Sequence, residues 1–220
     1  MQKGLLFDTN IPIGYGAGSS GAVSAALRHR YGKNKTNDLQ KVRAELRFIE
    51  NNFHGNSSGL DPLVSYFSKP VLIDENKEVS LLEEIAWQDT YTFFLIDTLQ
   101  SRSTAPLVAK FKTRIQDEDY LNDLKSVLVP DVDTAIQNLR EEKWDAVFEN
   151  IHDISMFQFK QFKSMILPDY HNLWLKGLAG DDFKLKLCGA GGGGFILGMA
   201  PDYIAAKKQM RGYKLSRIEF

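Results

Sequence analysis

The chain has 220 residues, of which 43% are hydrophobic, and its 27 basic and 28 acidic residues give a formal net charge of −1. The basic residues are scattered, which excludes an extended basic surface and makes nucleic acid an unexpected partner. No apolar run approaches the roughly 20 residues that span a bilayer, so we expect a cytoplasmic protein without a membrane partner. The single Cys188 cannot form an internal disulfide, and its neighbours suggest a buried structural thiol.

A glycine-rich turn at residues 12–20 leads directly into a helix of small and apolar residues. Gly14, Gly16 and Gly18 alternate with larger residues, so the backbone can adopt positive φ and come close to a bulky anion. Two serines then open the helix, where unpaired N–H groups and the helix dipole favour a negative ligand. The sequence predicts a phosphate cradle, and a tight strand-to-helix turn with a serine N-cap is the structural alternative.

Residues 4–7 (GLLF) predict a short strand before this turn. A strand with no N-terminal neighbour, and a phosphate turn within the first twenty residues, lead us to expect that earlier strands of the fold are missing. Core left uncovered in this way would favour self-association or a homodimer.

An amphipathic helix is predicted from Leu39 to Phe53, with Glu50 near its C-terminal end. The helix dipole disfavours a carboxylate there, which hints at a cation partner, although an exposed glutamate is the commoner explanation. A polar glycine loop then leads to Asp61 and Pro62. These two residues could be the N-cap and first residue of a helix, or Asp61 could orient or deprotonate a substrate hydroxyl.

Strands are also predicted at residues 71–73 and 92–97, the second of them long, apolar and expected to be central. A polar turn follows and places Arg102 and Thr104 at a strand end. Anionic substrates are often bound at such a place, although a turn of this composition is commonly only a turn.

Residues 105–167 show a helical pattern, with breaks expected at Pro130 and Pro168. The end of the chain predicts a strand at residues 184–188, a glycine run at 189–194, a strand at 195–199, a helix at 202–210 and a strand at 213–220. Four consecutive glycines are entropically costly, so a close approach of the backbone to another group explains them better than chance. This ending implies an α+β sandwich.

Three separated motifs together resemble the GHMP kinase superfamily, the kinases of galactose, homoserine, mevalonate and phosphomevalonate. Residues 12–20 are similar to its Pro-x₃-Gly-x-Gly-Ser-Ser phosphate motif, and residues 189–194 to its third motif, which lies against the phosphate loop. Residues 50–61 and 97–104 are similar to segments of the mevalonate kinases, the branch of the superfamily that this sequence matches best.

The resemblance implies an α+β GHMP kinase fold. Residues 1–85 would be the remainder of an N-terminally truncated phosphate-binding domain, and residues 86–220 a C-terminal GHMP kinase domain with a ferredoxin-like α/β sandwich. The implied activity is the ATP- and Mg²⁺-dependent phosphorylation of the mevalonate hydroxyl in isoprenoid biosynthesis. The alternatives are another GHMP kinase, for phosphomevalonate or a sugar, and a catalytically inactive truncated member.

The resemblance also implies roles for individual residues. Ser20 and Glu50 would hold Mg²⁺ with the ATP phosphates, Asp61 would be the catalytic carboxylate, and Arg102 and Thr104 would lie beside it in the catalytic site. The residues implied to bind the nucleotide are Gly14, Gly16, Ala17, Gly18, Ser19, Ser20, Gly189, Ala190, Gly191 and Gly192.

The sequence departs from the family pattern at three places. Tyr15 and Ala17 stand where many members carry Gly-Leu. Ser57 stands where the family has a proline, and no lysine matches the one that lies beside the family's catalytic aspartate. That lysine belongs to the family's N-terminal segment, for which we expect no counterpart in this chain.

Overall fold

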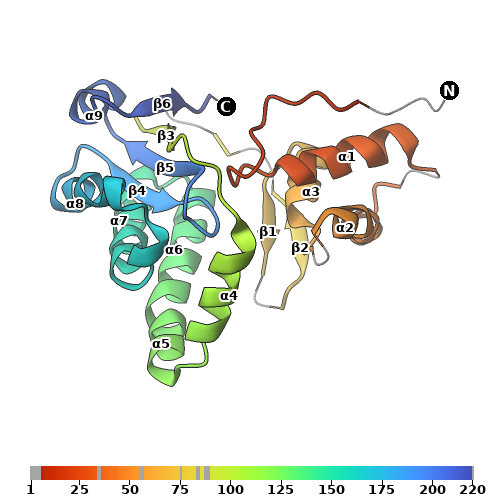
Figure 1. Ribbon diagram of the computed structural model, residues 1–220, viewed down its shortest axis with the longest axis horizontal. Helices are drawn as coiled ribbons and strands as arrows, with labels where there is room; N and C mark the ends of the chain where they lie inside the picture. Colours follow the sequence, from red (N-terminus) through yellow and green to blue (C-terminus); the bar gives the residue numbers. More distant parts are fainter. Residues whose placement is uncertain are drawn as a thin grey trace. The chain divides into compact units, whose positions relative to one another are not determined.

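The computed structural model describes residues 6–33, 36–54, 57–74, 76–82, 85–86 and 90–219 (Figure 1). The chain divides into two compact units. One comprises Met1–Ile13 and Ala17–Glu84, and the other comprises Gly14–Gly16 and Ile85–Phe220. The glycine turn therefore contributes residues to both units. The functional identities predicted for the two parts of the chain stay predictions.

Among its described residues, the first unit has three helices and a two-stranded antiparallel sheet. Its elements are α1 (Ser19–Tyr31), α2 (Leu39–His54), α3 (Leu60–Phe67), β1 (Val71–Ile73) and β2 (Val79–Leu81). Apolar residues at three- and four-residue spacing bury one side of α2 and α3, and the core of this unit contains Val42, Leu46, Leu63 and Val79. The predicted helices at α1 and α2 and the strand at β1 are confirmed.

Arg28 on α1 contacts both α2 and α3. Its side chain is 2% exposed, and its Nε donates a hydrogen bond of 2.6 Å to Glu45 on α2. The guanidinium also lies 4.5 Å from the ring centroid of Tyr66 on α3. Because a buried charge must be paired to be tolerated, these contacts fix α1 against α2 and α3.

The strand predicted at residues 4–7 is wrong for the two of these residues that the structure describes. Leu6 and Phe7 lie outside any strand and are exposed to solvent, Leu6 by 94%. A strand is stabilised by pairing with a neighbour, and none of the described strands pairs with this segment. Residues 4 and 5 lie outside the described residues.

In the part of the second unit that the structure describes, the strands form a four-stranded antiparallel sheet in the order β4-β5-β3-β6. Its strands are β3 (Thr92–Asp97), β4 (Lys184–Leu187), β5 (Phe195–Ala200) and β6 (Lys214–Arg217), and its α-helices are α4 (Thr104–Arg114), α5 (Glu118–Asp123), α6 (Val129–Arg140), α7 (Trp144–Gln161), α8 (His171–Ala179) and α9 (Tyr203–Gln209). Strand β3 lies between β5 and β6, as its apolar sequence predicts.

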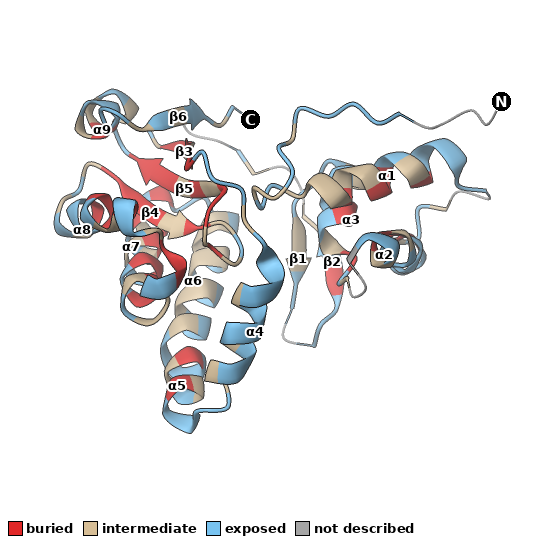
Figure 2. Ribbon diagram, viewed as in Figure 1, coloured by how far each residue is buried: buried red, intermediate tan, exposed pale blue. Residues whose placement is uncertain are grey.

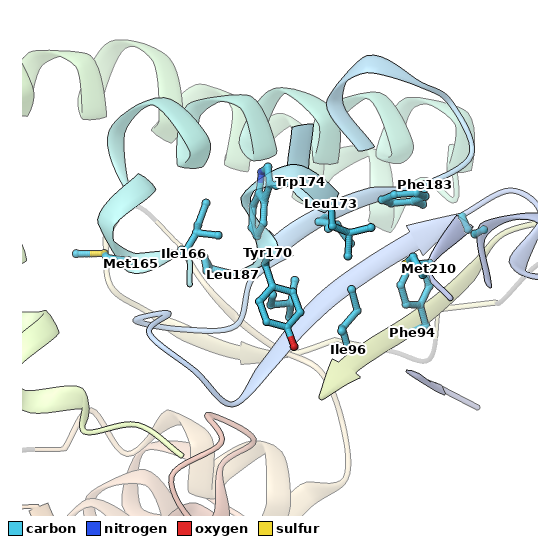
Figure 3. Packing of buried hydrophobic residues seen from close by; sticks show 14 residues of the cluster. Phe94, Ile96, Met165, Ile166, Tyr170, Leu173, Trp174, Phe183, Leu187 and Met210 are labelled. Atoms are coloured by element: carbon cyan, nitrogen blue, oxygen red, sulfur yellow. The ribbon is translucent and has the colours of Figure 1, made fainter. Parts of the chain in front are cut away.

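The core of the second unit lies between this sheet and its helices. Figure 2 shows buried residues on β4 and β5 and on faces of α7 and α8. The largest cluster includes Trp174 and Leu173 of α8 and Phe94 and Ile96 of β3 (Figure 3). Trp174 is fully buried, and its Nε1 donates to the carbonyl of Ser155 on α7. The sheet is therefore a rigid support for the loops at its ends.

The break predicted at Pro130 is wrong, whereas the one at Pro168 is confirmed. Helix α5 continues through a π-helical turn at Leu124–Leu128 into α6, and Pro130 lies in the first turn of α6. A proline inside a regular α-helix lacks one N–H and crowds the carbonyl four residues earlier. Here the π-helical turn, in which the N–H of Val129 donates to the carbonyl of Leu124, replaces the regular α-helical pattern just before Pro130. Pro168, by contrast, opens a short 3₁₀ turn before α8, a helix that the sequence reading missed.

Candidate functional site

The glycine turn has the backbone conformation that its sequence predicts. Gly14, Gly16 and Gly18 have φ angles of 79°, 73° and 74°, a left-handed region that side chains disfavour. Gly18 is the N-cap of α1, and no side chain caps this helix within the described chain. The serine N-cap alternative is therefore wrong. The first N–H groups of α1 have no intrahelical partner and are available to an anion.

Glu50 faces the start of α1 from the end of α2. Ser20 Oγ donates a hydrogen bond of 3.1 Å to Glu50 Oε1, and Ser57 Oγ donates to Glu50 Oε2. The glutamate is only 5% exposed, so the alternative of an exposed carboxylate is wrong. A buried carboxylate without a counter-charge is costly, and the described residues supply hydroxyl groups but no salt bridge to it.

The oxygen donors of Ser20 and Glu50 fit Mg²⁺. The described part of the chain contains no group of three or more His, Cys, Asp and Glu side chains that could hold a metal. Mg²⁺ does not require such a group, because it binds through one or two carboxylates and completes its shell with water and substrate phosphates. The buried carboxylate at the start of α1 is thus suited to a Mg²⁺ that also contacts phosphate.

Asp61 lies in the first turn of α3, beside the first turn of α1. Helix α3 begins at Leu60 with Gly59 as its N-cap, so Asp61 is not the cap and that alternative is wrong. A Cβ on Gly21 would lie 2.9 Å from the backbone carbon of Asp61, so glycine permits this close packing. Partial burial of the carboxyl group, and secondly the negative charge of Glu50, raise the pKa of Asp61.

In the second unit, Arg102 holds together segments that are distant in the sequence. Its Nη1 donates hydrogen bonds of 2.7 and 3.0 Å to the carbonyl oxygens of Cys188 and Gly191. Its backbone N–H donates to the carbonyl of Gly14 at 3.0 Å. Arg102 therefore connects the loop after β3 with the glycine turn and with the glycine run that follows β4.

The glycines of these segments leave room for the contacts. A Cβ on Gly16 would lie 2.2 Å from Nη2 of Arg102, and a Cβ on Gly194 would lie 2.3 Å from the carbonyl oxygen of Tyr15. The N–H of Phe195 donates a hydrogen bond to the carbonyl of Tyr15, and the aromatic rings of Tyr15 and Phe195 pack edge to face. The structure thus brings Tyr15 of the glycine turn against Gly194 and Phe195, at the end of the glycine run that resembles the third motif.

Two further predictions concern the site residue Thr104 and the structural thiol of Cys188. Thr104 is the first residue of α4 and is exposed. Cys188 is half-buried rather than fully buried, and burial raises the pKa of its thiol although Lys186 and Arg102 oppose the rise. A thiol held in its neutral form is a poor nucleophile, which agrees with the predicted structural role.

Sequence reasoning missed the involvement of Ser57, which contacts Glu50, and of Gln100, whose carbonyl accepts from the N–H of Gly194 at 2.7 Å. Ser57 carried one signal, its departure from the family pattern. The bond to Gln100 uses only the backbone, so no sequence signal marks it.

Across the described helices, none is both long and apolar enough to cross a bilayer.

Comparison with known proteins gives a family match and several relatives. Residues 3–69 match the family described as the GHMP kinases N terminal domain. A curated relative, the mevalonate kinase of Archaeoglobus fulgidus, is 26% identical over 196 residues, which cover 87% of this chain and 63% of the relative. The chain thus spans less than two thirds of that protein's length.

Solved structures of mevalonate kinases share the fold. The L. major enzyme in complex with R-mevalonate superposes with a TM-score of 0.64 at 19% identity, over 89% of this chain and 60% of that one. The enzyme from methicillin-resistant Staphylococcus aureus superposes with a TM-score of 0.56 at 19% identity, over 94% of this chain and 68% of that one. These matches confirm the mixed α and β fold predicted from the motifs.

Proposed function

We propose, from the premise that this chain is a relative of the GHMP kinases, that it transfers the γ-phosphoryl group of ATP to a small-molecule alcohol. We further propose mevalonate as that alcohol, which would place the chain in isoprenoid biosynthesis in the cytoplasm. The support is that the relative from A. fulgidus is a mevalonate kinase and that the L. major enzyme was solved with R-mevalonate. Residues 1–85 would carry phosphate binding, and residues 86–220 would form the C-terminal kinase domain.

The observation that carries the proposal is the buried Glu50, whose Oε1 lies 3.1 Å from Ser20 Oγ at the uncapped start of α1. Ser20 and Glu50 would hold Mg²⁺, which would neutralise charge on the transferred phosphoryl group when bound. The backbone N–H groups of the turn would bind the phosphate oxygens. The glycines and small residues proposed for this are those at positions 14, 16–20 and 189–192.

Asp61 would orient the acceptor hydroxyl and take its proton. A raised pKa makes its carboxylate a stronger proton acceptor than an ordinary aspartate, which suits a general base. Phosphoryl transfer depends mostly on positioning and on charge neutralisation, so a single oriented carboxylate suffices for the proton. Arg102 and Thr104 would complete the catalytic site from the loop after β3.

The test is ADP release by the folded chain with Mg²⁺, ATP and an acceptor panel of mevalonate, phosphomevalonate, homoserine and galactose. We expect turnover with mevalonate, abolished in Asp61→Asn and retained in Ser65→Ala, an exposed control on the same helix. Turnover with one of the other acceptors and not with mevalonate would show that this other acceptor is the substrate. A folded chain without any turnover would overturn the activity and favour an inactive member of the superfamily.

Self-association or a homodimer stays a prediction, which light scattering tests.

A further inference from the structure

Ser57 uses one hydroxyl group for two contacts. Its Oγ donates a hydrogen bond to Glu50 Oε2 and accepts one of 2.9 Å from the N–H of Gly59. The backbone N–H of Ser57 also donates to Asn51 Oδ1 at 2.7 Å, and the residue is half-buried. Because the backbone of Ser57 is held by the residue next to Glu50, its hydroxyl is fixed relative to that carboxylate.

Because Ser57 donates to only one oxygen of Glu50, the two carboxylate oxygens have different surroundings. Oε2 is occupied by the hydroxyl of Ser57, whereas Oε1 points to Ser20 at the start of α1. The carboxylate is thereby held in an orientation that presents one defined oxygen toward the helix start. A group that hydrogen-bonds to a metal-binding carboxylate in this way fixes its orientation and supports its affinity.

The second contact reaches the helix that carries Asp61. Gly59 is the N-cap of α3, with a φ of 75°, and Asp61 is the second residue of that helix. Gly59 is itself packed against α2, since a Cβ there would lie 2.9 Å from the carbonyl oxygen of Arg43. One hydroxyl therefore links the proposed metal carboxylate to the helix start that carries the proposed base.

We infer that Ser57 is a positioning residue that holds Glu50 for the divalent cation and fixes the first turn of α3 through the same hydroxyl. This inference rests on the proposed function. It assigns a role in cation binding to a residue that the sequence marked only as a departure from the family pattern. It also makes the cation affinity of the chain depend on a hydroxyl that does not need to touch the cation.

The neighbouring Ser58 provides a matched control. Its hydroxyl accepts from the N–H of Leu60 at 3.3 Å, and its carbonyl accepts from Arg43. Ser58 is exposed, and its hydrogen bonds to other described residues do not involve Glu50. Ser58→Ala therefore removes a hydroxyl from the same loop without removing the contact on which the inference depends.

The test measures Mn²⁺ binding to the full chain by electron paramagnetic resonance without nucleotide, in the wild type and in Ser57→Ala, Ser57→Thr, Ser58→Ala and Glu50→Gln. We expect Ser57→Ala to weaken Mn²⁺ affinity about 10-fold, the lower limit for loss of a group that supports a metal ligand. Ser57→Thr keeps the hydroxyl and should restore the affinity, and Ser58→Ala should match the wild type. Steady-state kinetics should show a raised requirement for Mg²⁺ in Ser57→Ala and an unchanged KM for the acceptor.

The outcomes separate this inference from the proposed function. If the wild type binds Mn²⁺, Glu50→Gln does not, and folded Ser57→Ala binds like the wild type, the role of Ser57 is overturned and the role of Glu50 stands. If Glu50→Gln binds like the wild type, or the wild type binds no Mn²⁺, the proposed metal site fails and the inference with it. Should Ser57→Ala not fold by circular dichroism, Ser57→Cys, with a weaker donor of similar size, carries the same expectation.

Discussion

The guanidinium of Arg102 donates a hydrogen bond of 2.7 Å to the backbone carbonyl of Cys188, which lies 86 positions later in the chain. This bond joins the loop after β3 to the end of β4, and Nη1 extends the connection to Gly191. Arginine suits this place because its planar guanidinium can donate in several fixed directions at once. The side chain of Arg102 is thus one of several groups that hold the glycine run of the second unit, together with the carbonyl groups of Met165 and Gln100 and the hydroxyl of Thr98.

The first prediction concerns Arg102→Lys. A lysine ammonium on a flexible stem cannot reproduce the fixed donor geometry of the guanidinium, so the glycine run should lose its defined shape. We expect the KM for ATP to rise about 10-fold or more, the cost of roughly one good hydrogen bond. Steady-state kinetics check this, with Lys208→Met, an exposed lysine of α9, as the control. An unchanged KM for ATP would show that the contacts of Arg102 do not support nucleotide binding.

The second prediction compares two glycines. Gly16→Ala combines a left-handed φ of 73° with a Cβ that would lie 2.2 Å from Nη2 of Arg102, whose position is fixed by its hydrogen bonds. Gly212→Ala has a φ of 94° and no atom within 4 Å of its Cβ, so it measures backbone strain alone. We expect about 1–2 kcal/mol of destabilisation in Gly212→Ala, and a larger loss together with weakened ATP binding in Gly16→Ala. Urea unfolding and calorimetry measure both, and equal losses would contradict the clash.

The third prediction concerns the pH dependence of Asp61. Its folded-state pKa is raised, so the stability that it contributes is full below its ordinary pKa and is lost as pH rises through the folded value. Above its folded-state pKa the ionised Asp61 therefore destabilises the fold relative to the protonated form. Asp61→Asn should raise the melting temperature at pH 7 and leave it unchanged near pH 3, while reducing kcat about 100-fold or more. Thermal unfolding at the two pH values checks this, and a lower melting temperature at pH 7 would refute it.

The fourth prediction concerns the pair of Asp97 and Lys214, whose Oδ2 and Nζ lie 2.8 Å apart. Burial alone would raise the pKa of Asp97, but hydrogen bonds from Lys214 and from the N–H of Leu99 lower it. A lowered pKa gives stability that is present above the ordinary value and is lost as pH falls through the folded one. Lys214→Met should therefore reduce the melting temperature at pH 7, and this difference should vanish near pH 2. A difference of the same size at both pH values would exclude the charge interaction as its cause.

The sequence by itself determined the local elements. The periodicity of α2, the apolar run of β3 and the glycines with positive φ before α1 were predicted because short-range sterics and patterning decide them. Helix α8 was missed, and so was strand β2, whose three residues Val-Ser-Leu lack the continuous apolar run Val-Leu-Ile that marked β1. The π-helical turn before α6 escaped prediction as well, because Pro130 alone indicates a break.

The assembly of the candidate site was decided only by the tertiary structure. Local sequence allowed Glu50 to be exposed and Asp61 to be an N-cap, and both alternatives fail because the packing of α1, α2 and α3 buries the glutamate and makes Gly59 the cap. The contact of Ser57 with Glu50 and that of Arg102 with Cys188 join residues 7 and 86 positions apart. Such contacts depend on how loops are placed by the packing of the elements that they connect, and local residue preferences carry no information on that placement.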